Sequence, residues 1–248
     1  MTRAFRNTFF LLLILLTKGG FAQNIGRIDF TDIRTNIENP ESPYYYPLLL
    51  ERIWTDDTTM NYSDYKHLYY GNVFQQYYHP YGMSDVKKEF SEIFKTANYV
   101  KAVEKGKEVL AENPVDIEVT LKMIISYLEL EDTLQAKIYG KKYFGFLDVI
   151  YASGDGKSLE TAYVVISVDD EYRIVGDLGL AVRQQVLIND CDRLFFEKSG
   201  QRKVRRKKIK ELYFNVQMPL MYLSKSFKDA DLPDPDKDPD EEEESQDE

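Results

Sequence analysis

The chain has 248 residues, of which 19 are tyrosine and 14 phenylalanine, so its composition is not that of a protein disordered throughout. Its only cysteine, Cys191, excludes an intramolecular disulfide, and a buried structural thiol is the expectation for it. The net charge is −10, but residues 228–248 alone carry twelve acids and two lysines, which also make −10. Acidity therefore belongs to the tail and assigns no partner to the rest of the chain.

Residues 1–22 have the three zones of a secretory signal peptide in the usual order. Arg3 and Arg6 precede an apolar run over 9–16, which at about 1.5 Å per residue is too short to cross a bilayer as a helix. Gly20 and Ala22 stand at the positions that small residues take before a cleavage site. The residue after this site is Gln23 and not cysteine, which argues against a lipoprotein. We expect an exported protein, periplasmic or secreted, with no transmembrane segment after cleavage.

Residues 23–150 read as a tyrosine-rich helical region. Apolar spacing and breakers predict helices over 29–38, 45–54 and 61–76, and the Asp56–Thr59 stretch predicts a turn between the last two. Four further helices follow between 84 and 150. Ala102 and Ala136 stand 34 residues apart, which is the tetratricopeptide period, so these helices are expected to form tetratricopeptide-like hairpins.

Residues 151–228 change to an alternating pattern after the glycine- and serine-rich stretch 153–158. That stretch is interpreted as a linker, because the spacing of its glycines does not match a phosphate-binding loop. Strands are predicted over 162–168, 172–175, 183–188, 193–197 and 211–216, with a turn at 169–171, and a closing helix over 218–227. Short turns between strands favour a small antiparallel sheet, and helices before strands favour an α+β fold. Residues 229–248 are predicted to be a disordered acidic tail.

The tyrosine-rich block offers a candidate binding surface, because tyrosine combines a large apolar ring with a polar tip. The other reading, which we favour, is a core built from these rings, with hydroxyls reaching the surface. His67 and His79 are the only histidines, and their spacing predicts no metal site. The candidate surface consists of Tyr45, Tyr46, Arg52, His67, Tyr69, Tyr70, His79 and Tyr81.

A basic run between residues 198 and 210 is a second candidate, for an anionic ligand or for the acidic tail. In an exported protein, we expect the ligand of this run to be an acidic glycan or a lipid headgroup and not nucleic acid. Alternatively, the run and the tail are both solvated and unconnected. The patch consists of Lys203, Arg205, Arg206, Lys207 and Lys208.

Several segments together resemble the bacterial domain of unknown function 4919. They are the tyrosine-rich stretches 42–48, 51–52, 57–59, 65–71 and 78–82 and the late strand 211–216, where Asn215 replaces the acid expected in the family. The resemblance covers most of residues 28–227 and leaves the acidic tail outside. It implies exported bacterial proteins with no assigned activity.

Two functions remain open from the sequence. The first is a non-catalytic cell-envelope binding or assembly module, whose partner would be an envelope protein or an anionic glycan or lipid. The second is a hydrolase or other enzyme with a site between the helices and the sheet. No catalytic residue, cofactor or metal is assigned, and no nucleic-acid partner is expected.

Overall fold

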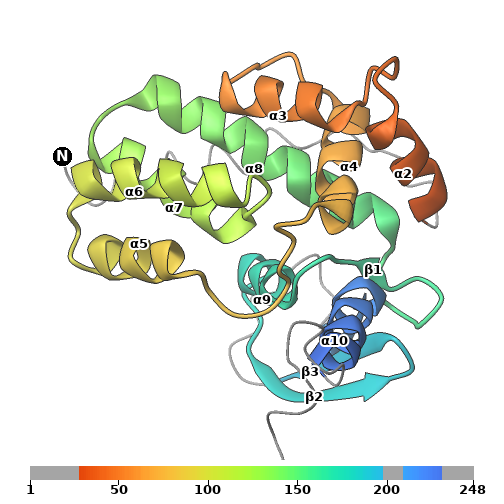
Figure 1. The fold of residues 1–248 in the computed structure, drawn as a ribbon. Coiled ribbons are helices and arrows are strands. Elements are labelled where there is room, and N and C mark those ends of the chain that lie inside the picture. The colour runs from red at the N-terminus through yellow and green to blue at the C-terminus, as the bar shows by residue number, and fades with distance from the viewer. Residues whose placement is uncertain (1–27, 198–208, 231–248) are drawn as a thin grey trace, which may run out of the picture.

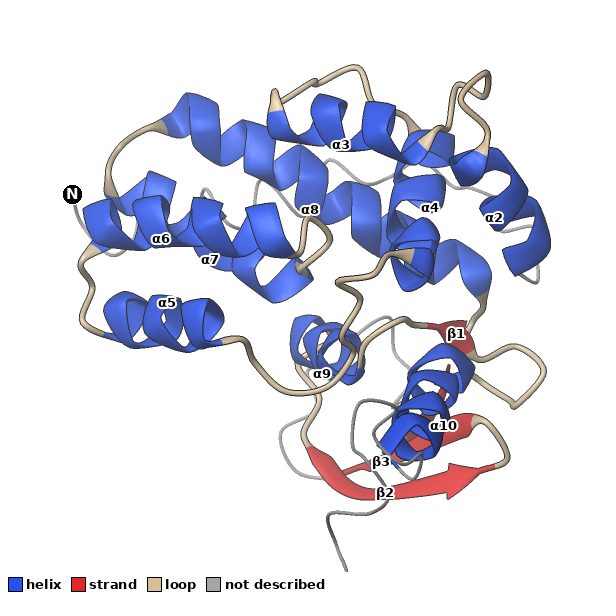
Figure 2. Ribbon diagram, in the orientation of Figure 1, coloured by secondary structure: helices blue, strands red, loops and turns tan. Residues whose placement is uncertain are grey.

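The computed structural model describes residues 28–197 and 209–230, which form an α+β fold with a predominantly helical first part and a sheet in the second (Figures 1 and 2). The predicted signal peptide lies outside the described residues. So do the candidate residues of the basic run and the tail from residue 231 onward.

The first helices are α2 (Phe30–Glu38), α3 (Tyr46–Trp54) and α4 (Tyr62–Gly71), followed by the 3-10 turn η1 (Asn72–Phe74). The helices predicted over 29–38 and 45–54 are confirmed. The helix predicted over 61–76 begins as expected, because the Asn61 side chain caps its first backbone N–H groups. It ends as an α-helix at Gly71 and tightens into the 3-10 turn.

The next four helices are α5 (Asp85–Lys95), α6 (Tyr99–Glu112), α7 (Ile117–Glu129) and α8 (Thr133–Ser153). Each packs against the next along the chain, and α8 also packs against α4. Helix α8 passes behind α4 and joins it to the later helices (Figure 1). No helix within the described ranges is both long enough and apolar enough to cross a membrane.

The second part contains a four-stranded sheet with the order β1-β4-β3-β2. Strand β1 pairs in parallel with β4, whereas β2–β3 and β3–β4 are antiparallel, so the expectation of a wholly antiparallel sheet is wrong. A parallel pair needs a crossover, and the chain between β1 and β4 contains a helix and two strands. The elements are β1 (Tyr163–Val164), α9 (Val168–Asp177), β2 (Val182–Ile188), β3 (Cys191–Phe196), β4 (Glu211–Asn215) and α10 (Gln217–Ala230).

Helix α9 replaces the predicted turn at 169–171 and the predicted strand over 172–175. The Ser167 side chain accepts a hydrogen bond from the backbone N–H of Asp169, and three acids occupy the first turn, where the helix dipole favours negative charge. Glu171, Ile174 and Val175 are buried along one face. This spacing is helical, and the short apolar run Ile174–Val175 alone resembled a strand.

One hydrophobic core joins the two parts, and tyrosines build much of it. Tyr69 and Tyr70 are 0% exposed, and both rings lie edge-on to each other with centroids 5.0 Å apart. Tyrosine hydroxyls of the first part also reach across to the second part. The Tyr70 hydroxyl donates to the carbonyl of Val164, and the Tyr78 hydroxyl donates to the carbonyl of Ile166. These bonds fix the segment between β1 and α9 against α4 and the chain that follows it.

Candidate ligand-binding pocket

A pocket of about 490 Å³ lies where the two parts meet. Its walls come from the segment 77–84 between η1 and α5, the junction of α6 with α7, and the segment 166–170 that begins α9. The segment leading to α5 passes beside α9 (Figure 1), and there the Ser167 hydroxyl donates to the carbonyl of Pro80. This volume lies within the range of small-molecule sites, about 300–1,000 Å³.

An ion-paired lysine stands in the pocket wall. The Lys87 ammonium lies 2.8 Å from Asp116 and 2.9 Å from Asp169, and the side chains of Lys87 and Asp116 are 9% and 6% exposed. Burial acts to lower the pKa of Lys87, but the two carboxylates prevail and raise it. Since one ammonium faces two carboxylates, the trio carries a net negative charge.

A buried carboxyl group, Asp170, forms another part of the wall. The Tyr69 hydroxyl donates to Asp170 Oδ2 at 2.7 Å and accepts a hydrogen bond from the backbone N–H of Ile166 at 3.3 Å. Burial raises the pKa of Asp170 to about 8, although the bond from Tyr69 opposes the shift. Burial also raises the pKa of the Tyr69 hydroxyl, and the neighbouring Asp170 reinforces that effect.

Aromatic rings cover one side of the pocket. Tyr77 is 44% exposed, His79 is exposed, and Tyr78 is buried with its hydroxyl on the carbonyl of Ile166. Tyr222 of α10 supports this side, because its ring lies edge-on to Tyr78 and to His79 with centroids 5.7 and 5.3 Å away. The C-terminal helix therefore helps to hold the aromatic wall in place.

The junction of α6 and α7 contributes further polar groups. Asn113 lies in the pocket wall, and its Oδ1 is buried without a hydrogen-bond donor among the described residues. Glu112 accepts a hydrogen bond from the Ser84 hydroxyl at 3.0 Å on the exposed side. Asp116 both caps α7, by accepting from the backbone N–H of Val119, and holds Lys87.

In the structure, the eight residues of the candidate surface predicted from the sequence do not lie together on one surface. His79 alone of the eight residues lines the pocket, and Tyr69 reaches it indirectly through Asp170. Tyr46, Tyr69 and Tyr70 are core residues, at most 3% exposed, while Tyr45 and Tyr81 are half-buried.

His67 lies in a different environment from His79. Its ring is 5% exposed and stacks on Tyr44, with centroids 3.9 Å apart and the planes almost parallel. Nδ1 lies 2.8 Å from the carbonyl of Ser63, and because a carbonyl only accepts, Nδ1 carries the proton. Nε2 has no hydrogen-bond partner in the described part of the chain.

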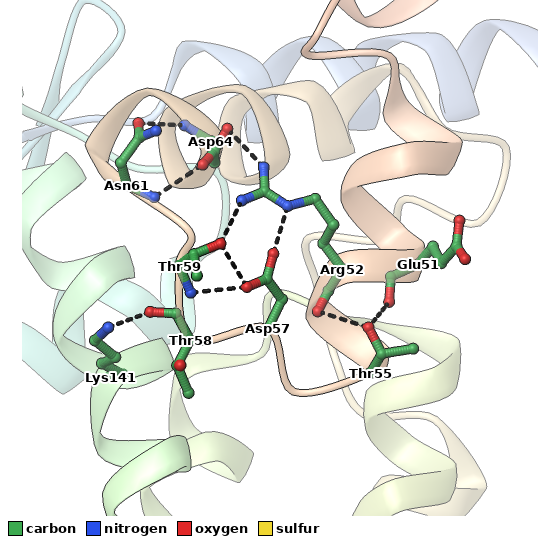
Figure 3. A network of polar contacts seen from close by, with 9 residues as sticks. All are labelled: Glu51, Arg52, Thr55, Asp57, Thr58, Thr59, Asn61, Asp64 and Lys141. Carbon is green, nitrogen blue, oxygen red and sulfur yellow. Dashed lines mark hydrogen bonds and ion pairs between the residues drawn. The ribbon is translucent and has the colours of Figure 1, made fainter.

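Arg52 forms part of a structural network between α3 and α4 (Figure 3). Its guanidinium contacts Asp57 at 2.7 Å and Asp64 at 3.0 Å. Hydrogen bonds from Thr59 and from Arg52 lower the pKa of Asp57 to about 2. Asp64 also closes the capping box with Asn61 at the start of α4. The contacts of Arg52 thus brace the connection between two helices.

Cys191 is buried, which confirms the expectation of a buried thiol. Burial raises its pKa, so the unreactive thiol form is favoured. Within residues 28–197 and 209–230, no three His, Cys, Asp or Glu residues are arranged to hold a metal ion.

Five polar residues of the pocket wall were not identified from the sequence, and these are Lys87, Asn113, Asp116, Asp169 and Asp170. The one local sequence signal for these residues was the run of acids after Ser167. Such a run is typical both of the first turn of a helix and of a turn between strands.

Comparison with known proteins gives one match. The family model "Domain of unknown function (DUF4919)" matches residues 31–225, which include every helix and strand that forms the pocket. No curated protein and no solved structure matches the chain. Since the model spans well over half of the sequence, this protein belongs to the DUF4919 family.

Proposed function

We propose that this protein is an exported, non-catalytic binding module of the cell envelope and that its ligand occupies the pocket between the helical part and the sheet. The observation that carries the proposal is a 490 Å³ pocket with convergent polar groups and an aromatic side, located where two structural parts meet. Binding sites favour such junctions, and a few placed polar groups within an apolar lining provide orientation and specificity.

A binding role is favoured over a hydrolase by the arrangement of the titratable groups. Lys87 is held by two carboxylates and Asp170 by Tyr69, so each is already engaged in the folded protein. The two histidines do not converge, because His67 stacks on Tyr44 and does not line the pocket. Nucleophilic catalysis would need a nucleophile and a base within hydrogen-bond reach of each other.

The proposal includes export and a tetratricopeptide-like arrangement of α5 to α8. Export is supported by the sequence of residues 1–22. The repeat is supported by Ala102 and Ala136, which stand one repeat period apart and are 0% and 5% exposed on α6 and α8. In this scheme the pair of repeats is a scaffold that supplies one wall of the pocket, and not an extended peptide groove.

A matched pair of variants on α6 tests the binding proposal. Ala111 is exposed and lines the pocket, whereas Val100 is 58% exposed and does not line it. Ala111→Trp should obstruct the pocket, and Val100→Trp should add the same ring elsewhere on the helix. The full chain is screened by ligand-observed NMR against a panel of amino-acid amides, dipeptides and monosaccharides.

Compounds that bind wild type and Val100→Trp but not Ala111→Trp are the expected result. If no compound of the panel binds, or if binding persists unchanged in Ala111→Trp, the pocket is not a ligand site and the proposal is rejected.

A further inference from the structure

We propose that the pocket selects an organic cation, such as a guanidinium or a primary ammonium group, by its excess of carboxylates beside an aromatic wall. This inference rests on the proposed function, because it concerns the same pocket. It adds the chemical class of the ligand.

The charges that line the pocket are unequal in number. Asp170 lines the pocket but adds little negative charge at neutral pH, because burial raises its pKa to about 8. Lys87 is the one Lys or Arg among the described lining residues, whereas three further acids, Glu112, Asp116 and Asp169, line the same pocket. Two of those acids already neutralise Lys87 at 2.8 and 2.9 Å, and one positive charge cannot balance both. An anionic ligand would meet this surplus negative charge and find the ammonium already occupied. A cationic ligand would meet attraction.

One buried acceptor in the pocket wall lacks a donor. Asn113 lines the pocket, and its Oδ1 is buried without a hydrogen-bond donor among the described residues. Buried acceptors are normally satisfied, so an N–H-rich ligand group is the chemical complement of this wall.

The aromatic wall favours the same class. The faces of aromatic rings attract ammonium and guanidinium groups, and Tyr77, Tyr78 and His79 line the same pocket as the carboxylates. A bare metal ion is a poorer match, because the described residues hold no group of three His, Cys, Asp or Glu ligands arranged for one. Charge, an open acceptor and aromatic rings thus agree on an organic cation.

The test compares two nearly isosteric probes, acetyl-arginine amide and acetyl-citrulline amide. The arginine probe carries a charged guanidinium group where the citrulline probe carries a neutral urea group. Titration of the full chain, followed by NMR shifts of the protein, should show the arginine probe bound at least about tenfold more tightly. The preference should weaken as salt is raised from about 0.02 M to about 0.3 M, since part of the site is solvent-exposed.

Charge-removing variants locate the effect. Glu112→Gln and Asp169→Asn should each reduce the preference for arginine over citrulline by several-fold while leaving citrulline binding unchanged. Both residues are exposed and line the pocket, and Lys87 keeps its ion pair with Asp116 in either variant, so both variants should fold. Glu104→Gln is the control, because Glu104 is exposed on the same helix and does not line the pocket.

The outcomes separate this inference from the function on which it rests. Equal affinity for the two probes, or a preference that Glu104→Gln weakens as much as Glu112→Gln does, overturns the cation assignment. If neutral compounds of the screening panel still bind wild type and fail to bind Ala111→Trp, the pocket remains a ligand site of another class. If nothing binds the pocket, both proposals fall together.

Discussion

The hydroxyl of Tyr69 on α4 donates a 2.7 Å hydrogen bond to the carboxyl group of Asp170 on α9, across 101 residues of sequence. Tyr69 is 0% exposed, and its hydroxyl also receives the backbone N–H of Ile166. One phenol therefore satisfies a buried acid and a buried amide at once. This contact positions Asp170 in the pocket wall and joins the first part of the fold to the second.

Replacing Tyr69 by phenylalanine should destabilise the protein by about 1–3 kcal/mol, because it leaves the buried acceptor on Asp170 and the amide of Ile166 without their partner. Urea unfolding followed by circular dichroism measures the change. Tyr62→Phe is the control, because Tyr62 is 46% exposed and should change stability by less than about 0.5 kcal/mol. Equal effects of the two substitutions would show that the Tyr69 hydroxyl contributes nothing specific.

Glu171→Gln should stabilise the protein at neutral pH, on the order of 1–3 kcal/mol. Glu171 is 0% exposed, and burial together with nearby Asp192 and Asp170 raises its pKa from 4.5 to about 9. At pH 7 the folded protein must therefore keep a proton that the unfolded chain releases. Stability should fall as pH rises from about 4.5 to about 9.

The glutamine variant should lose this component of the pH dependence, which urea unfolding at several pH values would reveal. Glu104→Gln, at an exposed site, serves as the control and should follow wild type. A Glu171→Gln profile that parallels wild type would contradict the raised pKa of Glu171.

His67 should make the fold sensitive to mild acid. Burial lowers its pKa from the ordinary value of 6.5, and a second proton would sit on Nε2, which has no acceptor. The unfolded chain then binds more protons than the folded one, so stability falls as pH drops below about 6.5. His67→Phe keeps a ring beside Tyr44 and should abolish this loss. A histidine titration by NMR that places the pKa of His67 above 6.5 would disprove the expectation.

Two glycines of α8 should respond oppositely to alanine. A Cβ at Gly145 would lie 2.6–2.7 Å from the ring of Tyr65, so Gly145→Ala should cost about 1–3 kcal/mol. A Cβ at Gly140 would meet nothing within 4 Å, and Gly140→Ala should stabilise the helix by about 0.5–1 kcal/mol. Thermal and urea unfolding of the two variants gives the sign of each change, and destabilisation by Gly140→Ala would refute the open space beside that residue.

Lys87→Met should destabilise the protein by about 3–5 kcal/mol, because Asp116 is 6% exposed and would lose its cation. Lys105→Met is a matched change on a neighbouring helix, where the partners Glu89 and Glu108 are more than half exposed. It should cost at most about 1 kcal/mol. Similar losses in urea unfolding for both would indicate that the ion pairs of Lys87 are worth no more than surface pairs.

Local signals were sufficient for most helices and for the later strands. Asn61, Asp29 and Ser84 cap helices that begin where the sequence places them, because capping acts between residues two or three apart. The strand predicted over 211–216 agrees within one residue, and the predicted closing helix begins within one residue of α10 and ends three residues before it. Helix α9 was missed, because the adjacent apolar residues Ile174 and Val175 are compatible with the periodicity of a helix and with that of a strand.

The sequence by itself determined the α+β class and the family, since these depend on composition, short-range periodicity and recurring segments. Only the tertiary structure decided that β1 pairs in parallel with β4, that Tyr69 and Tyr70 are buried, and that Lys87, Asp116 and Asp170 share one pocket. Lys87, Asp116 and Asp170 are 29 to 83 positions apart in the sequence, so no interaction between sequence neighbours brings them together. They meet because packing of apolar faces brings distant segments together, and the buried polar groups must then find partners where packing has placed them.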